Sequence, residues 1–252
     1  MMVKTIKRMV TVLPLTLLVI LTGCATTNTA DNRDPIEGLN RAIFSFNDSL
    51  DKAVFKPVAQ GYRDYTPDPL QQGVGNFFGN IEDVVTTIND LLQFKFKQTG
   101  SDGLRVLVNT TLGIFGIFDV ATRMGFEKHN EDFGQTLGRW GIDSGPYLVL
   151  PVLGPSTLRD TVGIVVDNSA FDPIYQIDHI PSRNSLIVVE GVDNRAELLG
   201  ASKVLEKAAL DRYNFLKESY LQKRENDVQD SAQAFDLDSG EQAFLENPPT
   251  AF

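Results

Sequence analysis

Apolar residues recur every three or four positions near the start of the chain, which is the spacing of one face of an α-helix. In the first such segment these positions are Leu39, Ile43, Phe46, Leu50 and Val54. The pattern predicts an amphipathic helix. Because proline cannot continue the hydrogen bonding of a helix, we expect this helix to end at Lys56-Pro57.

A second helical pattern covers Phe77 to Leu92 and is the clearest in the sequence. Two rows of apolar residues run along it, while Glu82, Asp83 and Asn89 lie on the opposite side. An apolar face this broad packs into a protein core or lies in a membrane interface. The pattern leaves both open, and a water-soluble domain would place the face in its core.

Two later segments are free of charge. Val106 to Phe118 spans thirteen residues with two glycines, a length that fits an interfacial, re-entrant or buried segment better than a full membrane span. Fifteen uncharged residues also separate Asp143 from Arg159, and three of them are prolines, so no continuous helix is expected there. Irregular backbone at membrane depth is tolerated only where protein buries it or where it lines a water-filled cavity.

The C-terminal part contains one more helical pattern, which predicts a long helix from Asn194 to Lys223. From Glu225 to Phe252 the chain has seven acidic and no basic residues, so residues 225–252 are predicted to be a disordered acidic tail. Alternation typical of strands is nearly absent. The sequence therefore predicts a mainly α-helical fold.

The first residues predict export and lipidation. Three basic residues precede an apolar stretch from Met9 to Leu21, which is typical of a secretory signal. The stretch ends in Leu-Thr-Gly before Cys24, the only cysteine, and this resembles a bacterial lipobox. We expect residues 1–23 to be removed and Cys24 to be lipidated; the alternative is a chance cysteine after an ordinary signal. Ala25 then indicates sorting to the outer membrane.

Further division of the chain follows from these patterns. Residues 24–34 are small and polar, as in a flexible tether, and residues 35–224 form the helical domain. Without the three basic residues of the signal, 23 − 3 = 20 basic residues face 33 acidic ones, a formal charge of −13. A chain this acidic is poorly suited to bind nucleic acid, which requires clustered basic residues.

Motifs for catalysis are missing. The two histidines, His129 and His179, lie in polar, turn-rich stretches and form no cluster that predicts a metal site. Ser144 lacks the preceding glycine of a nucleophile elbow, and no phosphate-binding loop occurs. We predict no enzyme, no metal and no cofactor, and we expect the Glu131-Asp132 pair to be ordinary solvated charges.

Several stretches together resemble a known family. These stretches are DPIEGLNRAIFSFND (Asp34–Asp48), NFFGNIEDVVTTINDLLQFKF (Asn76–Phe96), NTTLGIFGIFDVA (Asn109–Ala121), EDFGQTLGRWGIDSGPYLVLPVLGPSTLRD (Glu131–Asp160) and DRYNFLKESYLQKR (Asp211–Arg224). The sequence resembles the MlaA/VacJ family of outer-membrane lipoproteins. This resemblance implies a single ring-like helical domain in the inner leaflet of the outer membrane, with Gly/Pro-rich irregular segments around a central polar channel.

The resemblance also implies a function and partners. Members of the family remove phospholipids misplaced in the outer leaflet of the outer membrane and maintain its lipid asymmetry. They sit beside an outer-membrane porin trimer and pass phospholipids to a periplasmic carrier protein, which delivers them to an inner-membrane ABC transporter with an MCE protein. The alternative is a porin-associated structural lipoprotein of the envelope without transport activity.

Positions for the lipid pathway come from the same resemblance. The glycine-rich segment GRWGIDSGPY (Gly138 to Tyr147) would lie along the channel and flex beside it, and the first helix would lie near the channel. The pathway residues implied in this way are Phe46, Asn47, Gly138, Gly141, Gly145 and Pro146. Asp143 departs from the family pattern, and its carboxylate would alter how the channel handles an anionic headgroup.

Overall fold

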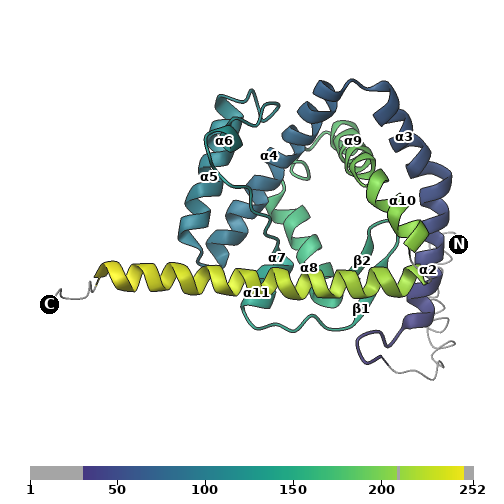
Figure 1. Ribbon diagram of the computed structural model, residues 1–252. Coiled ribbons are helices and arrows are strands. Elements are labelled where there is room, and N and C mark those ends of the chain that lie inside the picture. The colour runs from purple at the N-terminus through teal and green to yellow at the C-terminus, as the bar shows by residue number, and fades with distance from the viewer. Residues whose placement is uncertain (1–30, 209–210, 247–252) are drawn as a thin grey trace, which may run out of the picture.

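The computed structural model describes residues 31–208 and 211–246 (Figure 1). The fold is mainly helical, as the sequence predicts, and no helix among the described residues is both long and apolar enough to cross a membrane. The helices α2 to α7 are Glu37–Leu50, Lys56–Tyr65, Asp68–Leu92, Phe96–Thr111, Val120–Arg123 and Phe133–Arg139. The helices α8 to α11 are Leu158–Val166, Ile180–Glu197, Leu199–Ala208 and Arg212–Glu246.

The first helix does not end at Lys56-Pro57, so that prediction is wrong. One π-helical turn, η1 (Asp51–Phe55), joins α2 directly to α3, and Pro57 lies in the first turn of α3. The wider π turn alters the local hydrogen bonding just before the proline, which has no N–H to donate. A continuous helical arm from Glu37 to Tyr65 results. A second π turn, η2 (Asp167–Phe171), extends α8 in the same way.

Helices α4 and α5 form an antiparallel pair that buries polar side chains. Asp83 and Arg105 are almost fully buried between them and pair at 3.2 Å. Leu91, on the apolar side of α4, is 51% exposed. The polar side of α4 is therefore the packed one. Its buried residues are Phe78, Asn80, Asp83, Thr86, Asn89 and Asp90.

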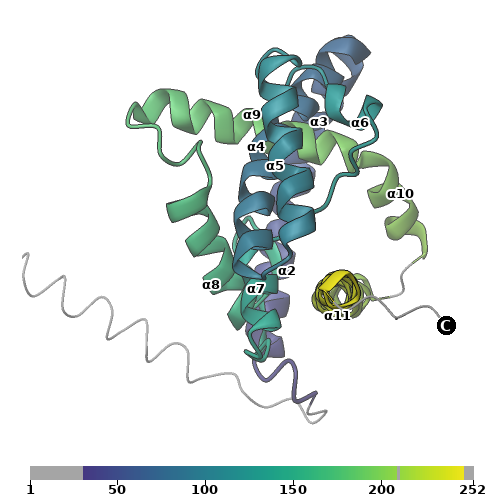
Figure 2. The same cartoon turned by 90° about the vertical axis from the view of Figure 1, so that its left-hand side faces the viewer.

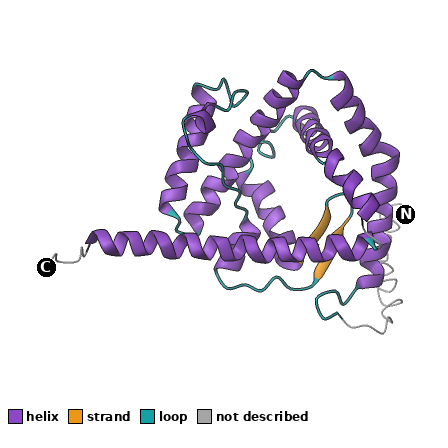
Figure 3. Ribbon diagram, in the orientation of Figure 1, coloured by secondary structure: helices purple, strands orange, loops and turns teal. Residues whose placement is uncertain are grey.

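A β-hairpin occupies the charge-free, proline-containing segment (Figure 3). Strands β1 (Tyr147–Leu150) and β2 (Gly154–Thr157) are antiparallel, with Tyr147 opposite Thr157 and Leu150 opposite Gly154. The sequence does not predict strands here, although it excludes a continuous helix. The side chain of Asn40 on α2 holds β1, because it accepts from the N–H of Val149 and donates to the carbonyl of Tyr147.

The C-terminal helices differ most from the prediction. The expected helix over Asn194 to Lys223 is divided among α9, α10 and α11. The prediction of disorder from Glu225 is wrong as far as Glu246, because α11 continues to that residue. This stretch contains the good helix formers Ala, Gln and Glu. Residues 247–252 of the predicted tail lie outside the described residues, as do residues 1–30.

The long helix α11 stands apart from the other helices. In Figure 1 it crosses in front of them, and in Figure 2 it is seen nearly end-on beside the layer that contains α2, α4, α5 and α7. It packs on α7 and β2. The N-terminal half of α11 thus ties the hairpin and α7 together from one side of that layer.

Burial in the described part of the chain is inverted relative to a water-soluble protein. Only nine apolar residues are buried, whereas 22 polar or charged residues are buried. Thirty large apolar side chains are exposed. Soluble proteins bury charged side chains rarely. Only small apolar clusters occur inside, such as Ala59 with Ala196 and Leu199, or Tyr147 with Val149 and Tyr213. The interior is therefore held mainly by hydrogen bonds and ion pairs.

Candidate functional site: a polar cavity between the helices

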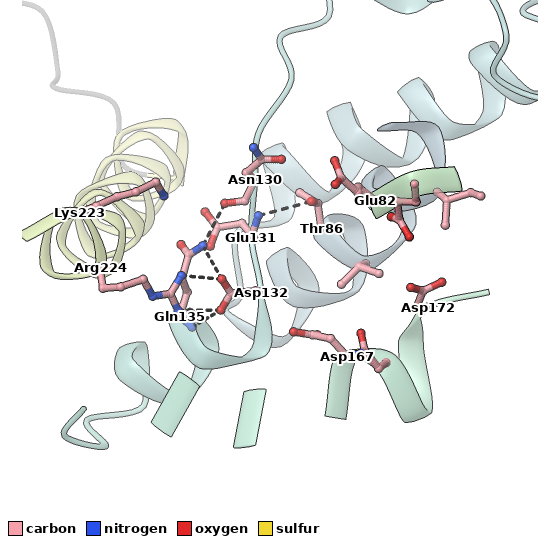
Figure 4. A pocket seen from close by; sticks show the side chains of 14 residues that line it. Glu82, Thr86, Asn130, Glu131, Asp132, Gln135, Asp167, Asp172, Lys223 and Arg224 are labelled. Atoms are coloured by element: carbon pink, nitrogen blue, oxygen red, sulfur yellow. Dashed lines mark hydrogen bonds and ion pairs between the residues drawn. The ribbon is translucent and has the colours of Figure 1, made fainter. Parts of the chain in front are cut away.

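A cavity of about 340 Å³ lies between α4, α7, η2, α9 and α11 (Figure 4). Its lining is mostly polar, and six carboxylates face two cations. Lys223 and Arg224 lie on one side of it, while Glu82 and Asp172 lie on the other. The carboxylates are Glu82, Glu131, Asp132, Asp167, Asp172 and Glu190.

Arg224 is the centre of the basic side. Its guanidinium lies 2.6 Å from Asp132, which precedes α7, and 3.0 Å from Asp160 on α8. Asp160 also accepts hydrogen bonds from Tyr220 at 2.8 Å and from Arg159 at 3.0 Å. This network joins α11 to α7 and α8 with charges that are largely shielded from water.

The carboxylates of this network stay ionised. Burial opposes ionisation of Asp160, but hydrogen bonds and charge from Arg224, with the charge of Arg159, hold its pKa below the ordinary value. Burial likewise raises the pKa of Asp132, and the contacts with Arg224 and Gln135 outweigh it, so the net shift is downward. The positive charge of Arg224 is therefore balanced by these two carboxylates of the protein.

The acidic side behaves differently. Burial first, and then the charges of Asp172 and Glu82, raise the pKa of Glu190 to about 7. Burial raises the pKa of Asp167 to about 6, although its carboxylate accepts hydrogen bonds from Asn89 and from the N–H of Phe133. This part of the cavity can therefore hold or release protons near neutral pH. Such a lining favours binding of a polar group and disfavours binding of an acyl chain.

A second polar cluster lies next to the cavity, between α4, α5 and the segment before α7. Lys95 pairs with Glu131, and His129 Nδ1 lies 3.0 Å from the buried Asp102. The prediction that Glu131-Asp132 are ordinary solvated charges is wrong, since both are ion-paired. Nowhere in residues 31–208 and 211–246 do three or more His, Cys, Asp or Glu side chains form a group that could hold a metal ion.

Of the predicted pathway residues in the glycine-rich segment, Gly138 lies in the last turn of α7, and Gly141, Gly145 and Pro146 lie between α7 and β1. Gly138 allows close packing, because a Cβ there would lie 2.8 Å from both Arg159 and Val228. Gly141 ends α7 with φ of +88°, and Gly145 has φ of +67° beside Leu158. These conformations favour glycine. The segment is thus fixed by packing and turns.

Four more predicted residues complete this picture. Asp143 is exposed, and the carbonyl of Pro146 accepts from the N–H of Leu158 at 3.1 Å. Phe46 is 56% exposed on α2, whereas Asn47 donates to the carbonyl of Leu150 and accepts from the N–H of Val152. The structure therefore brings Asn47 onto the turn of the hairpin.

Taken together, the predicted pathway residues surround the hairpin and do not line the polar cavity. Cys24 lies outside the described residues. Sequence reasoning missed the cavity residues because they come from five elements, with Arg224 and Asp132 92 positions apart. Two of them, Glu131 and Asp132, stand out in the sequence, but the sequence predicts ordinary solvated charges there and not a cavity lining.

Comparison with known proteins assigns the chain to a family. The family model described as MlaA lipoprotein matches residues 32–227. The chain belongs to the MlaA family. An MlaA relative from Escherichia coli K12, named intermembrane phospholipid transport system lipoprotein MlaA, is 34% identical over 91% of this chain and 89% of its own.

Other MlaA relatives and a solved structure agree with this assignment. The MlaA of Haemophilus influenzae is 32% identical over 83% of this chain and 86% of its own. An uncharacterized protein of Rickettsia bellii is 37% identical over 78% of this chain and 77% of its own.

A solved chain from work on the structural basis for maintenance of bacterial outer membrane lipid asymmetry has a TM-score of 0.69 and 33% identity. That match covers 77% of this chain and 98% of the solved one. The MlaA family is described as a lipoprotein and not by a reaction, in line with the lack of catalytic motifs in the sequence.

Proposed function

We propose that this MlaA family member removes mislocalised phospholipids from the outer leaflet of the outer membrane and passes them to a periplasmic carrier protein, so that lipid asymmetry is maintained. The observation that carries the proposal is the inverted burial: charged residues inside and large apolar side chains outside. The names of the relatives, which describe an intermembrane phospholipid transport lipoprotein, support the same function.

The apolar exterior supports embedding in the inner leaflet. Moving one large apolar side chain from water into hydrocarbon contributes about 1.5–3 kcal/mol, and many such side chains are exposed. The backbone is mostly helical, so its polar groups are bonded within the segment, as a lipid environment requires. In this proposal the helices form a ring whose rim faces lipid, and Cys24 carries the acyl chains that anchor it.

The polar interior supports passage of a headgroup. A phospholipid headgroup that crosses hydrocarbon loses the hydration of its charges, which costs several kcal/mol or more. A cavity lined by polar side chains, among them carboxylates, amides and Lys223, lowers that cost while the acyl tails remain in lipid. The step needs no covalent chemistry. The sequence carries no nucleotide-binding motif, so the energy comes from partners or from a downhill gradient.

Partners follow from this place in a transport route. An outer-membrane porin trimer would sit beside the embedded ring, and the periplasmic carrier would take the phospholipid at its inner side. The carrier would then deliver it to an inner-membrane ABC transporter with an MCE protein. The naming of the relatives after an intermembrane transport system supports a route of this kind.

Deletion of the gene tests the function. We expect outer-leaflet phospholipid to rise in the deletion strain and to return to normal with the wild-type gene. A cavity-filling Val85→Trp variant should fail to restore it, because Val85 lines the cavity. Val84→Trp on the same helix does not alter the lining and should restore it. Membrane levels of both variants show that they fold.

The outcomes separate two readings of the protein. An unchanged phospholipid level in the deletion strain would refute transport and leave a porin-associated structural lipoprotein as the function. A rise that Val85→Trp reverses as well as wild type would keep the transport function but remove this cavity from the lipid pathway.

A further inference from the structure

The polar cavity has an acidic side with little counter-charge. Glu190 on α9 lies near Asp172 and Glu82, and no cation among the described residues offsets the effect of these like charges on it. Asp172 accepts from the N–H of Ile174 at 2.7 Å and likewise has no basic partner there. Of the three carboxylates, Glu82 alone forms an ion pair in the described part of the chain, with Lys128 at 3.3 Å, and both side chains are partly exposed. A cation inside the cavity would therefore stabilise three carboxylates at once.

The other carboxylates of the cavity are already bonded within the protein. They are Glu131, Asp132 and Asp167, whose partners are Lys95, Arg224 and Asn89 respectively. The negative charge that is left for a ligand is thus concentrated on the side formed by Glu82, Asp172 and Glu190.

The opposite side offers a cation. In Figure 4, Lys223 and Arg224 lie across the cavity from Glu82 and Asp172. The charge of Arg224 is balanced by carboxylates of the protein, whereas the side chain of Lys223 is 71% exposed and pairs with Asp227, one turn further along α11, at 2.7 Å. An exposed pair of this kind is weak. A phosphate can therefore take the place of Asp227, which also lies 3.7 Å from Arg224 and keeps that partner.

The size of the cavity suits a small polar group. Its volume of about 340 Å³ falls within the range of about 300–1,000 Å³ that is usual for small-molecule sites. Neutral polar side chains also line it; they are Thr86, Asn130, Gln135 and Asn168. The cavity thus combines a cationic side, an anionic side and a neutral polar lining.

We propose that the cavity binds a zwitterionic headgroup, with its phosphate at Lys223 and its ammonium among Glu82, Asp172 and Glu190, and that the protein thereby favours phospholipids that carry an ammonium group. The inference rests on the proposed passage of headgroups through this cavity and adds which headgroup is preferred. A protonated amine brings three N–H donors and a positive charge, which are what a partly buried carboxylate requires. The glycerol of phosphatidylglycerol brings hydroxyl groups but no cation, so its phosphate meets the acidic side as a like charge.

Competition between two lipids tests the preference. The purified, lipidated full chain in detergent is given equal amounts of phosphatidylethanolamine and phosphatidylglycerol with the same acyl chains, and native mass spectrometry counts the bound lipids. We expect bound phosphatidylethanolamine to exceed bound phosphatidylglycerol by about tenfold, the effect of one hydrogen bond between charged groups. Equal binding of the two lipids would overturn the proposal.

Two variants separate the two sides of the cavity. Glu190→Gln keeps the size of the side chain but removes its charge, so it should weaken binding of phosphatidylethanolamine until the two lipids bind almost equally. Glu197→Gln removes an exposed carboxylate of the same helix outside the lining, and the preference should remain. Lys223→Gln should weaken both lipids alike, because both carry a phosphate. Lys52→Gln breaks a similar exposed pair with Asp48 and should weaken neither.

Other results would contradict the arrangement. An equal loss of both lipids in Glu190→Gln would indicate a structural role for Glu190, and an undiminished preference in that variant would place the ammonium elsewhere. Soluble phosphoethanolamine carries the same two charges without acyl chains, and at the concentration of the lipid it should not displace bound phosphatidylethanolamine. Displacement would make the cavity a site for small soluble amines and would also overturn the proposal.

The same variant in cells distinguishes this inference from the proposed function. A phospholipase A added outside the cells digests outer-leaflet phospholipid, and the two lysophospholipids are measured in the deletion strain that carries each gene. Wild type should lower both products, whereas Glu190→Gln should lower lysophosphatidylglycerol and leave lysophosphatidylethanolamine high. If wild type lowers neither product, the proposed function fails. If Glu190→Gln lowers both as well as wild type does, transport stands and the headgroup preference is wrong.

Discussion

Arg224 shows how a single side chain holds the polar interior together. Its guanidinium binds the carboxylates of Asp132 and Asp160; Arg224 and Asp160 are shielded from water, while the side chain of Asp132 is 39% exposed. No local pattern predicts such a contact, because the partners stand 92 and 64 positions away. The sequence identifies the segments that carry these residues by family resemblance, but it does not indicate that they meet.

Substituting Arg224 should therefore be costly. In Arg224→Met, Asp132 and Asp160 lose their counter-charge, and we expect the free energy of unfolding to fall by about 3–5 kcal/mol, as for other broken buried pairs. Denaturant unfolding in detergent measures it. Arg33→Met is the control, because Arg33 and one of its partners, Glu218, are more than half exposed and the other, Asp31, lies only two residues away; a loss of about 0–1 kcal/mol is expected. Equal losses would contradict the buried network.

The same residues determine how the stability of the fold changes as the pH is lowered. Since the pKa values of Asp132 and Asp160 are lowered in the folded protein, their contribution to stability is present above the ordinary aspartate pKa. It is lost as the pH falls through the lowered folded values. The Arg224→Met variant should lack that part of the acid loss.

At the scale of elements, the helices were largely predictable and the hairpin was not. The apolar period of α4 is long and regular, so its existence follows from the sequence alone. Strands β1 and β2 have four residues each, too few for a pattern of alternation. Their partner groups come from α2, where Asn40 and Asn47 supply amides that bond the hairpin backbone. Such side-chain support leaves no periodic signal.

Removing one of these amides tests the support. Asn47→Ala loses the bonds to Leu150 and Val152, and we expect faster amide exchange at Val152 and a loss of about 1 kcal/mol in the free energy of unfolding. Asn47→Asp keeps an acceptor for Val152 and should protect that amide partly. The control is Asn194→Ala on the exposed side of α9, with unchanged exchange at Val152. No change in Asn47→Ala would show that the hairpin holds itself.

For the whole molecule, the sequence left the place of the apolar faces open, and the structure decides it. The broad apolar face of α4 was expected in a core if the domain were water-soluble, yet α4 packs through its polar side. Periodicity gives the faces of a helix but not the medium that each face contacts. The cavity was likewise beyond prediction, since it exists only once five elements have assembled around it.

Attachment of the whole molecule depends on the N-terminal cysteine in our proposal. Cys24→Ala should lower the amount of protein retained in the outer membrane, because the acyl chains contribute about 0.8 kcal/mol for each buried methylene in addition to the apolar exterior. Fractionation of the envelope measures it. Ala25→Asp is the matched control: it should remain lipidated but move to the inner membrane. Full retention of Cys24→Ala would show that the acyl chains are not the main anchor.

The inverted burial has a consequence for how stability changes with temperature. The heat capacity of unfolding rises with the apolar surface that is newly exposed and falls with the polar surface. In detergent, which covers the apolar exterior in both states, the described residues, with 22 buried polar and nine buried apolar side chains, expose unusually little new apolar surface on unfolding. The heat capacity change of the protein should lie below the usual figure of about 12–15 cal/mol/K per residue. Its free energy of unfolding then curves only weakly with temperature, so cooling or warming over the range of growth temperatures changes its stability little.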